Sequence, residues 1–121
     1  MPRPIHFEIL ADDPEKTIDF YKSIFHWEIA PWSDGEQAYW PVKTGSDDTP
    51  GINGGIMKRH FQQAVINTIA VESLDEMLKK VHDAGGTTVH GPNEVPGVGN
   101  HAYCADPEGN LFGLMQAFTP D

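Results

Sequence analysis

The stretch HFEILADDPEKTIDFYKSIFHWEI, residues 6–29, combines the period of a strand with the period of a helix. Alternation predicts a strand over Pro4–Leu10, because successive side chains of a strand point to opposite faces. One face would carry Ile5, Phe7 and Ile9, and the other would carry His6, Glu8 and Leu10. The predicted strand is therefore apolar on one side and ionisable on the other.

A helix is predicted directly after this strand. Asp12 or Asp13 is suited to the N-cap and Pro14 to the first turn, because the first N–H groups of a helix lack intrahelical acceptors. Apolar side chains then recur at helical spacing, which supports the helix; these are Ile18, Tyr21, Ile24 and Phe25.

Three further strands complete the first half. They are predicted at Trp27–Ala30, Gln37–Lys43 and Gly54–Lys58, with a polar loop rich in Gly and Pro, residues 44–53, before the last of them. β-Branched and aromatic residues bounded by Gly and Pro are the usual signal for such strands. The element order of the first half is therefore β-α-β-β-β.

The second half repeats that order. A strand at Val65–Val71 leads to the capping box Ser73–Glu76, and Gly85 and Gly86 end the helix, as expected from the chemistry of helix ends. The helix would bury Leu74, Met77, Leu78 and Val81. After it we expect strands at Thr87–His90, His101–Cys104 and Leu111–Ala117, a loop over Gly91–Gly99, and a turn at Asp106–Asn110.

The two halves can be superposed at an offset of 60, which pairs Ile9 with Ile69 and Ile18 with Leu78. Further along, Ala38-Tyr39 is paired with Ala102-Tyr103, and Gly55-Ile-Met57 with Gly113-Leu-Met115. We interpret the chain as one α+β domain, 1–121, built from an internal repeat of residues 1–60 and 61–121. Two such units can each bury a sheet face that neither could bury alone.

Composition narrows the possible partners. The 121 residues are 39% hydrophobic and carry a net charge of −10, which argues against nucleic acid and anionic membranes and is compatible with a neutral or cationic small ligand. No apolar run reaches membrane-spanning length and no signal peptide is recognisable, so a cytoplasmic location is expected. Cys104, the only cysteine, is interpreted as a small buried apolar residue.

The stretch at residues 6–29 and a second one at residues 95–116, VPGVGNHAYCADPEGNLFGLMQ, resemble the vicinal oxygen chelate superfamily. That superfamily includes glyoxalase I, extradiol dioxygenases, methylmalonyl-CoA epimerase and bleomycin-resistance proteins. The resemblance implies two tandem β-α-β-β-β modules in a curved, half-open mixed sheet, with helices on the convex side and the site on the concave side. It also implies a homodimer.

In metal-dependent members, four ligand positions lie on the first and fourth strands of the modules. Matched to this sequence, they fall on His6, Ile66, Gly55 (or its neighbour Gly54) and Gly113. Only His6 can bind a metal, whereas catalytic sites use three or more protein ligands. We therefore expect no metal cofactor. A divalent ion held in a rearranged site by His6, Glu8 and His101 remains the alternative.

Two functions stay open. In the first, the protein binds a small apolar or aromatic ligand, and Gly113 is an emptied ligand position with room for that ligand or for Met57 and Met115. In the second, it is a lyase or isomerase of glyoxalase-like type that uses the rearranged metal site or acid–base chemistry by His6 and Glu8. The predicted ligand-binding residues are Tyr39, Trp40, Gly55, Met57, His101, Tyr103, Gly113 and Met115.

Overall fold

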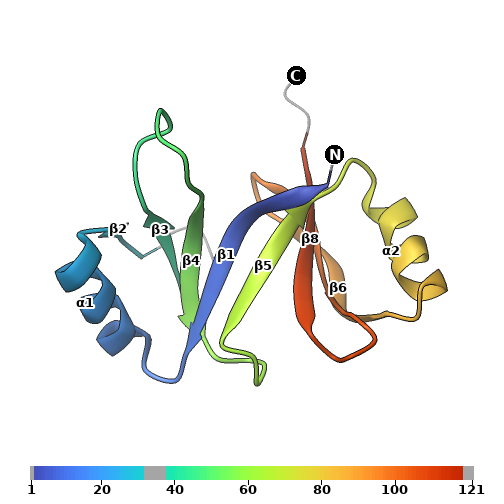
Figure 1. Cartoon of the computed structure of the whole chain (residues 1–121), viewed down its shortest axis with the longest axis horizontal. Helices are drawn as coiled ribbons and strands as arrows, with labels where there is room; N and C mark the ends of the chain where they lie inside the picture. The colour runs from blue at the N-terminus through green and yellow to red at the C-terminus, as the bar shows by residue number, and fades with distance from the viewer. Residues whose placement is uncertain (1, 32–37, 119–121) are drawn as a thin grey trace. The chain divides into compact units, whose positions relative to one another are not determined.

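The computed structural model describes residues 2–31 and 38–118, which form two helices and eight strands (Figure 1). Gln37, the first residue of a predicted strand, lies outside the described ranges. The chain divides into two compact units. One unit is His6–Ile66, and the other starts at Asn67 and includes the first residues of the chain, up to Ile5. We call the two β-α-β-β-β sets of strands module one and module two; the first strand of each begins two or three residues inside the other unit.

Module one has the predicted order. It contains β1 (Arg3–Ala11), α1 (Pro14–Phe25), β2 (Glu28–Ile29), β3 (Tyr39–Lys43) and β4 (Asn53–Lys58). Its strands lie in the order β2-β3-β4-β1, and β1 runs parallel to β4 while the other neighbours are antiparallel. The β-α-β-β-β prediction is confirmed here.

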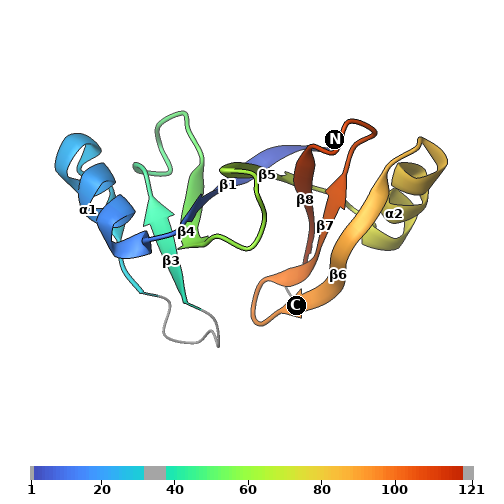
Figure 2. The same cartoon turned by 90° about the horizontal axis from the view of Figure 1, so that it is seen from below.

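Module two repeats this plan with β5 (Val65–Ala70), α2 (Leu74–Asp83), β6 (Thr87–Val95), β7 (Gly99–Ala105) and β8 (Leu111–Ala117). Its strands lie in the order β5-β8-β7-β6, with β5 parallel to β8. Figure 2 shows α2 running along β6 in this module. The α+β class, with two tandem units of one topology and mixed strand directions, is confirmed.

The predicted helix starts are confirmed. The Asp13 carboxylate accepts a hydrogen bond from the Lys16 N–H at 3.3 Å. The Ser73 hydroxyl accepts one from the Glu76 N–H at 3.2 Å. Both side chains satisfy N–H groups that the first turn of a helix leaves without partners. The sequence signals at these two helix ends thus act locally.

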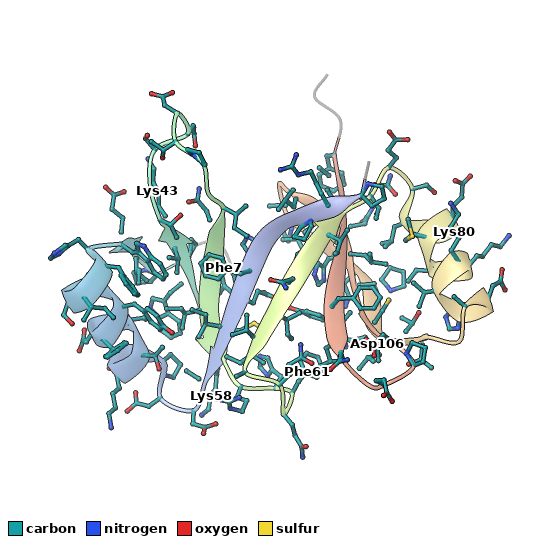
Figure 3. All side chains as sticks on the ribbon, in the orientation of Figure 1. Phe7, Lys43, Lys58, Phe61, Lys80 and Asp106 are labelled. Carbon is teal, nitrogen blue, oxygen red and sulfur yellow. The ribbon has the colours of Figure 1, made fainter. Side chains whose placement is uncertain are left out.

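Each helix packs on one face of its own module's sheet. In module one the core comprises Ile18, Ile29, Val42 and Ile56, with Phe7, Ile9, Tyr21, Trp27 and Trp40 against them; Phe7 is labelled in Figure 3. In module two it comprises Val71, Leu74, Ala102, Cys104 and Leu114, with Ile69, Met77, Leu78, Val81 and Phe112. The alternation of side chains then assigns the remaining strand residues to the other face of each sheet.

The last turn of α1 is exposed. Ile24 and Phe25 continue the predicted helical spacing, but they are 47% and 53% exposed, whereas Ile18 is buried. Phe25, the last residue of α1, stacks on the Trp27 ring at a centroid distance of 5.1 Å, which is a favourable aromatic contact.

The predicted loop Gly91–Gly99 is also wrong, because β6 continues to Val95 and β7 already begins at Gly99. The pairing of β6 with β7 shifts register between His90 and Asn93, around Gly91 and Pro92. β6 is the edge strand of module two. An edge strand tolerates Pro92, which has no N–H to donate, and Gly91, whose φ is 95°, because their backbone is not needed to pair with a further strand. Gly and Pro mark a bulge here.

Candidate functional site

In module one, the side of the sheet opposite α1 carries a glycine surrounded by polar side chains. Glu8 of β1 pairs with Gly55 of β4, and Tyr39 of β3 pairs with Met57. By alternation from Phe7 and Ile56 on the helix side, these residues share the opposite face with His6. We call His6, Glu8, Tyr39, Gly55 and Met57 the Gly55 face.

Tyr39 covers Gly55. A side chain added at Gly55 would meet the Tyr39 hydroxyl and ring first, so glycine is what allows the tyrosine to lie there. The hydroxyl makes a hydrogen bond of 2.8 Å with Nε2 of His6. This face therefore brings together an imidazole and a phenol, and Glu8, a residue only 6% exposed, lies beside Gly55 in the strand register.

Burial keeps both members of the pair uncharged. It lowers the pKa of His6, because a buried imidazolium loses hydration. Burial, and secondly the charge of Glu8, raises the pKa of Tyr39. At neutral pH the His6–Tyr39 pair is thus a neutral hydrogen bond near a carboxylate, an arrangement that can accept or donate a proton.

Module two has a matching face, opposite α2. Gly113 of β8 pairs with Thr68 of β5 on one side and with Tyr103 of β7 on the other, while His101 pairs with Met115. We call Thr68, His101, Tyr103, Gly113 and Met115 the Gly113 face. The rings of His101 and Tyr103 meet edge to face at 4.5 Å, a favourable aromatic geometry.

Two polar atoms converge over Gly113. A Cβ at this position would lie 2.8 Å from Nε2 of His101 and 2.9 Å from Oγ1 of Thr68. Thr68 is only 2% exposed, and within residues 2–31 and 38–118 its hydroxyl has no hydrogen-bond partner. A buried hydroxyl without a partner is rare in folded proteins and costs about 1–3 kcal/mol.

These registers revise the predicted repeat. Because Tyr39 pairs with Met57 and His101 pairs with Met115, the counterpart of Tyr39 is His101 and not Tyr103. Both cover the glycine of their own face. The space over Gly113, predicted to be open for a ligand or for Met57 and Met115, is therefore not open, because the ends of His101 and Thr68 lie there. Tyr39 lies over Gly55 in the same way.

Thr68 was missed from the sequence. The offset of 60 that paired Ile9 with Ile69 also pairs Glu8 with Thr68, and the structure places both opposite the glycine of their face. The expected counterpart of His6, Ile66, is an apolar side chain with no exposed surface. Glu8 and Thr68, which lie opposite Gly55 and Gly113 in the strand register, are therefore the equivalent candidate residues of the two modules.

The residues present do not fit the metal centre of the superfamily's metal-dependent members. Two of the four matched positions are Gly55 and Gly113, whose space borders Tyr39 and His101, and a third is Ile66. Within residues 2–31 and 38–118, no group of three or more His, Cys, Asp and Glu side chains is arranged to hold a metal ion. A Tyr hydroxyl with a raised pKa is also a poor metal ligand.

Two other predicted residues lie in the cores. Trp40, expected to contact a ligand, packs with the helix-side core of module one, on the face opposite Tyr39, and is left out of the candidate site. Cys104 is fully buried in module two and burial raises the pKa of its thiol, which confirms that it is a small buried apolar residue and no reactive nucleophile.

A separate hollow of about 380 Å³ lies at the start of α2. Its lining includes Glu72, Ser73, Glu76, Met77 and Lys80; Lys80 is labelled in Figure 3. None of the residues of the Gly55 or Gly113 face borders it. Its mixed charges do not indicate a ligand, and we do not include it in the candidate site.

The chain resembles known proteins in sequence. The model of the Glyoxalase/Bleomycin resistance protein/Dioxygenase superfamily matches residues 3–114. The anthracycline biosynthesis protein DnrV of Streptomyces peucetius is 28% identical over 93% of this chain and 46% of its own length. CFP32 of Mycobacterium tuberculosis, provisionally named a glyoxylase, is 27% identical over 90% of this chain and 42% of its own. The chain spans less than half the length of these relatives.

The fold is also found among solved structures. A variant of the Streptomyces coelicolor methylmalonyl-CoA epimerase, in complex with 2-nitronate-propionyl-CoA, has a TM-score of 0.69 to this chain. The match covers 97% of this chain and 98% of that one at 14% sequence identity. At this identity the likeness shows the fold alone.

Proposed function

The chain belongs to the glyoxalase/bleomycin resistance protein/dioxygenase superfamily, and from this premise we propose that it binds a small aromatic molecule without the usual metal centre. The observation that carries the proposal is the replacement of metal-ligand positions by Gly55 and Gly113, each bordered by an aromatic or imidazole ring. Rings and a few polar atoms are what a site for a planar organic ligand needs.

The Gly113 face is the better candidate for this ligand. It offers the rings of His101 and Tyr103, the thioether of Met115, and no Asp, Glu, Lys or Arg side chain among its five residues. An aromatic ligand also agrees with the name of the relative DnrV, an anthracycline biosynthesis protein. We therefore expect a neutral, planar ligand on module two.

Metal analysis and binding together test this function. We expect purified protein incubated with Zn²⁺ or Ni²⁺ and then desalted to carry no stoichiometric metal, and to bind a planar aromatic probe such as 1-naphthol saturably in a calorimetric titration. Trp27 and Trp40 lie in the core of module one, so calorimetry reports on module two better than tryptophan fluorescence. One tightly bound ion per chain, lost in His6→Ala, would contradict the proposal.

Acid–base catalysis is the second candidate, and the 2.8 Å hydrogen bond between His6 and Tyr39 favours it. On the Gly55 face, Glu8 or His6 would remove a proton from the carbon beside a substrate carbonyl, and the Tyr39 hydroxyl would donate to the carbonyl oxygen. Such chemistry would make the protein an isomerase or lyase.

Solvent exchange tests this second candidate. Methylmalonyl-CoA, the substrate class in the name of the structural neighbour, would be incubated with the protein in D₂O and examined for deuterium next to its carbonyl. Exchange that disappears in both Glu8→Gln and Tyr39→Phe would support catalysis on the Gly55 face. Exchange at the rate of the buffer would exclude this substrate.

The remaining expectations stay predictions. A homodimer, implied by the resemblance, would be tested by sedimentation of the purified chain. Across the described ranges, neither helix has the length and apolar character to cross a bilayer. Cytoplasmic location would be tested by fractionation.

A further inference from the structure

The buried hydroxyl of Thr68 is the polar group that the fold of module two leaves unexplained. It is 2% exposed and makes no hydrogen bond with any residue that the structure describes. Valine has nearly the same shape and would fill the same volume without leaving a polar atom unpaired. A threonine here therefore lowers stability unless something outside the chain pairs with it.

The hydroxyl points to a place where a second polar atom also points. Oγ1 of Thr68 and Nε2 of His101 both lie within 3 Å of the position that a Gly113 side chain would take. His101 is only partly buried, so its ring forms the outer side of this space and Thr68 the inner side.

We propose that Thr68 and His101 form a polar subsite on the Gly113 face that binds the hydroxyl or carbonyl oxygen of an aromatic ligand. The inference rests on the proposed function and names the ligand class: a planar ring that carries a neutral oxygen. Tyr103 and Met115 contact the ring, while Thr68 and His101 hydrogen-bond the oxygen. Gly113 keeps the backbone free of a side chain that would block this oxygen.

Charge selects the neutral form of that oxygen. The Gly113 face has no Lys or Arg to pair with an anion, and Thr68 is only 2% exposed, so an anion there would lose most of its hydration. A phenol or ketone oxygen can form a hydrogen bond with the threonine hydroxyl, and removing such a neutral oxygen from water costs little free energy. A carboxylate would be bound less well.

Two matched probes and two matched variants test the subsite. The probes are 1-naphthol and 1-methylnaphthalene, which differ by a hydroxyl in place of a methyl group. The variants are Thr68→Val, which removes the hydroxyl, and Thr68→Ser, which keeps it. In calorimetric titrations we expect the wild type and Thr68→Ser to prefer 1-naphthol by about tenfold, the size of one net hydrogen bond, and Thr68→Val to lose that preference.

Unfolding of the free protein in urea gives an independent reading. We expect Thr68→Val to unfold at the same or a higher urea concentration than the wild type, because no hydrogen bond within the chain is lost. A clear loss of stability in Thr68→Val would overturn the inference, since the hydroxyl would then have a partner inside the protein.

The outcomes separate the two proposals. If both probes bind the wild type with equal affinity, or if Thr68→Val keeps the preference for 1-naphthol, the subsite is disproved while aromatic binding stands. If neither probe binds the wild type, the proposed function fails and the subsite fails with it.

Discussion

The Gly55 face and the Gly113 face start from the same strand arrangement and differ in what their polar groups bind. On the Gly55 face, His6 and Tyr39 pair with each other at 2.8 Å. On the Gly113 face, the Thr68 hydroxyl has no hydrogen-bond partner among the described residues. One module thus pairs its polar side chains with each other, while the other leaves the Thr68 hydroxyl unpaired at a cost in stability. Binding sites often carry such a cost.

Replacing Gly55 or Gly113 by alanine should have the largest effect on stability, and the two losses should differ. In Gly55→Ala the methyl group would meet the Tyr39 ring and hydroxyl, so the tyrosine must move and its bond to His6 is lost. We expect a loss of about 2 kcal/mol in the free energy of unfolding. Gly113→Ala should cost roughly half as much, because it meets only the ends of the His101 and Thr68 side chains.

Urea denaturation of both variants measures this difference. Equal losses would mean that Tyr39 adjusts as easily as His101, and the two faces would then be alike in rigidity. A variant at an open glycine, Gly97→Ala, is unsuitable as a control because of its φ of 76°. Gly45→Ala, in the loop before β4, has a nearest neighbour at 3.4 Å and serves better.

Lowering the pH should weaken module one through His6. Burial holds its pKa in the folded protein below the ordinary value of 6.5, so the unfolded chain takes up the proton first as the pH falls. The stability that the neutral imidazole contributes is therefore present above pH 6.5 and is lost below it. Tyr39 and Glu8 are the titratable groups on the same face.

His6→Gln should flatten this part of the profile of unfolding midpoint against pH. His60→Gln, at an exposed position, is the matched control and should leave the slope as it is in the wild type. Identical profiles for the wild type and His6→Gln would show that the His6 imidazole is hydrated in the folded protein.

The smallest effect is expected at the turn between β7 and β8, which sets the register of His101 against Met115. The Asp106 carboxylate, labelled in Figure 3, accepts hydrogen bonds from the Asn110 side chain at 3.0 Å and from the N–H groups of Asn110 and Glu108 at 2.9 Å. The hydrogen bond from the Asn110 side chain, above all, lowers the pKa of Asp106.

Asp106→Ala should therefore lower the urea midpoint slightly at neutral pH. The folded-state pKa is depressed below 3.8, so the contribution is present above that pH and disappears as the carboxylate is protonated. The gap between variant and wild type should close in acid. A gap that stays constant would assign the effect to the backbone of the turn and not to the charge.

Much of the fold could be predicted because its signals are local. Asp13 and Ser73 cap helices by bonding N–H groups three residues away, and the alternation around Phe7 and Glu8 assigns the faces of β1. The extent of β6 could not be predicted, since Gly91 and Pro92 mark a bulge as readily as a loop. Local chemistry does not tell a bulge from a turn.

The site was harder to predict than the fold. His6, Glu8 and both glycines were named as candidates from the sequence. Tyr39 was matched with Tyr103, whereas the strand registers match it with His101, because the loop between the paired strands is longer in the first half (44–52) than in the second (106–110). Thr68 was overlooked since threonine is ordinary in a strand. Its importance depends on long-range burial and on a missing hydrogen bond, neither of which leaves a pattern in the sequence.

Mapping the bound probe by NMR tests the central claim most directly. In a ¹⁵N-labelled sample titrated with 1-naphthol, we expect saturable shifts of the amide signals of Thr68, His101 and Gly113. The amide signals of His6 and Gly55 should not move. Shifts confined to His6, Tyr39 and Gly55 would contradict it, because the ligand would then bind the face whose hydrogen bonds are already made.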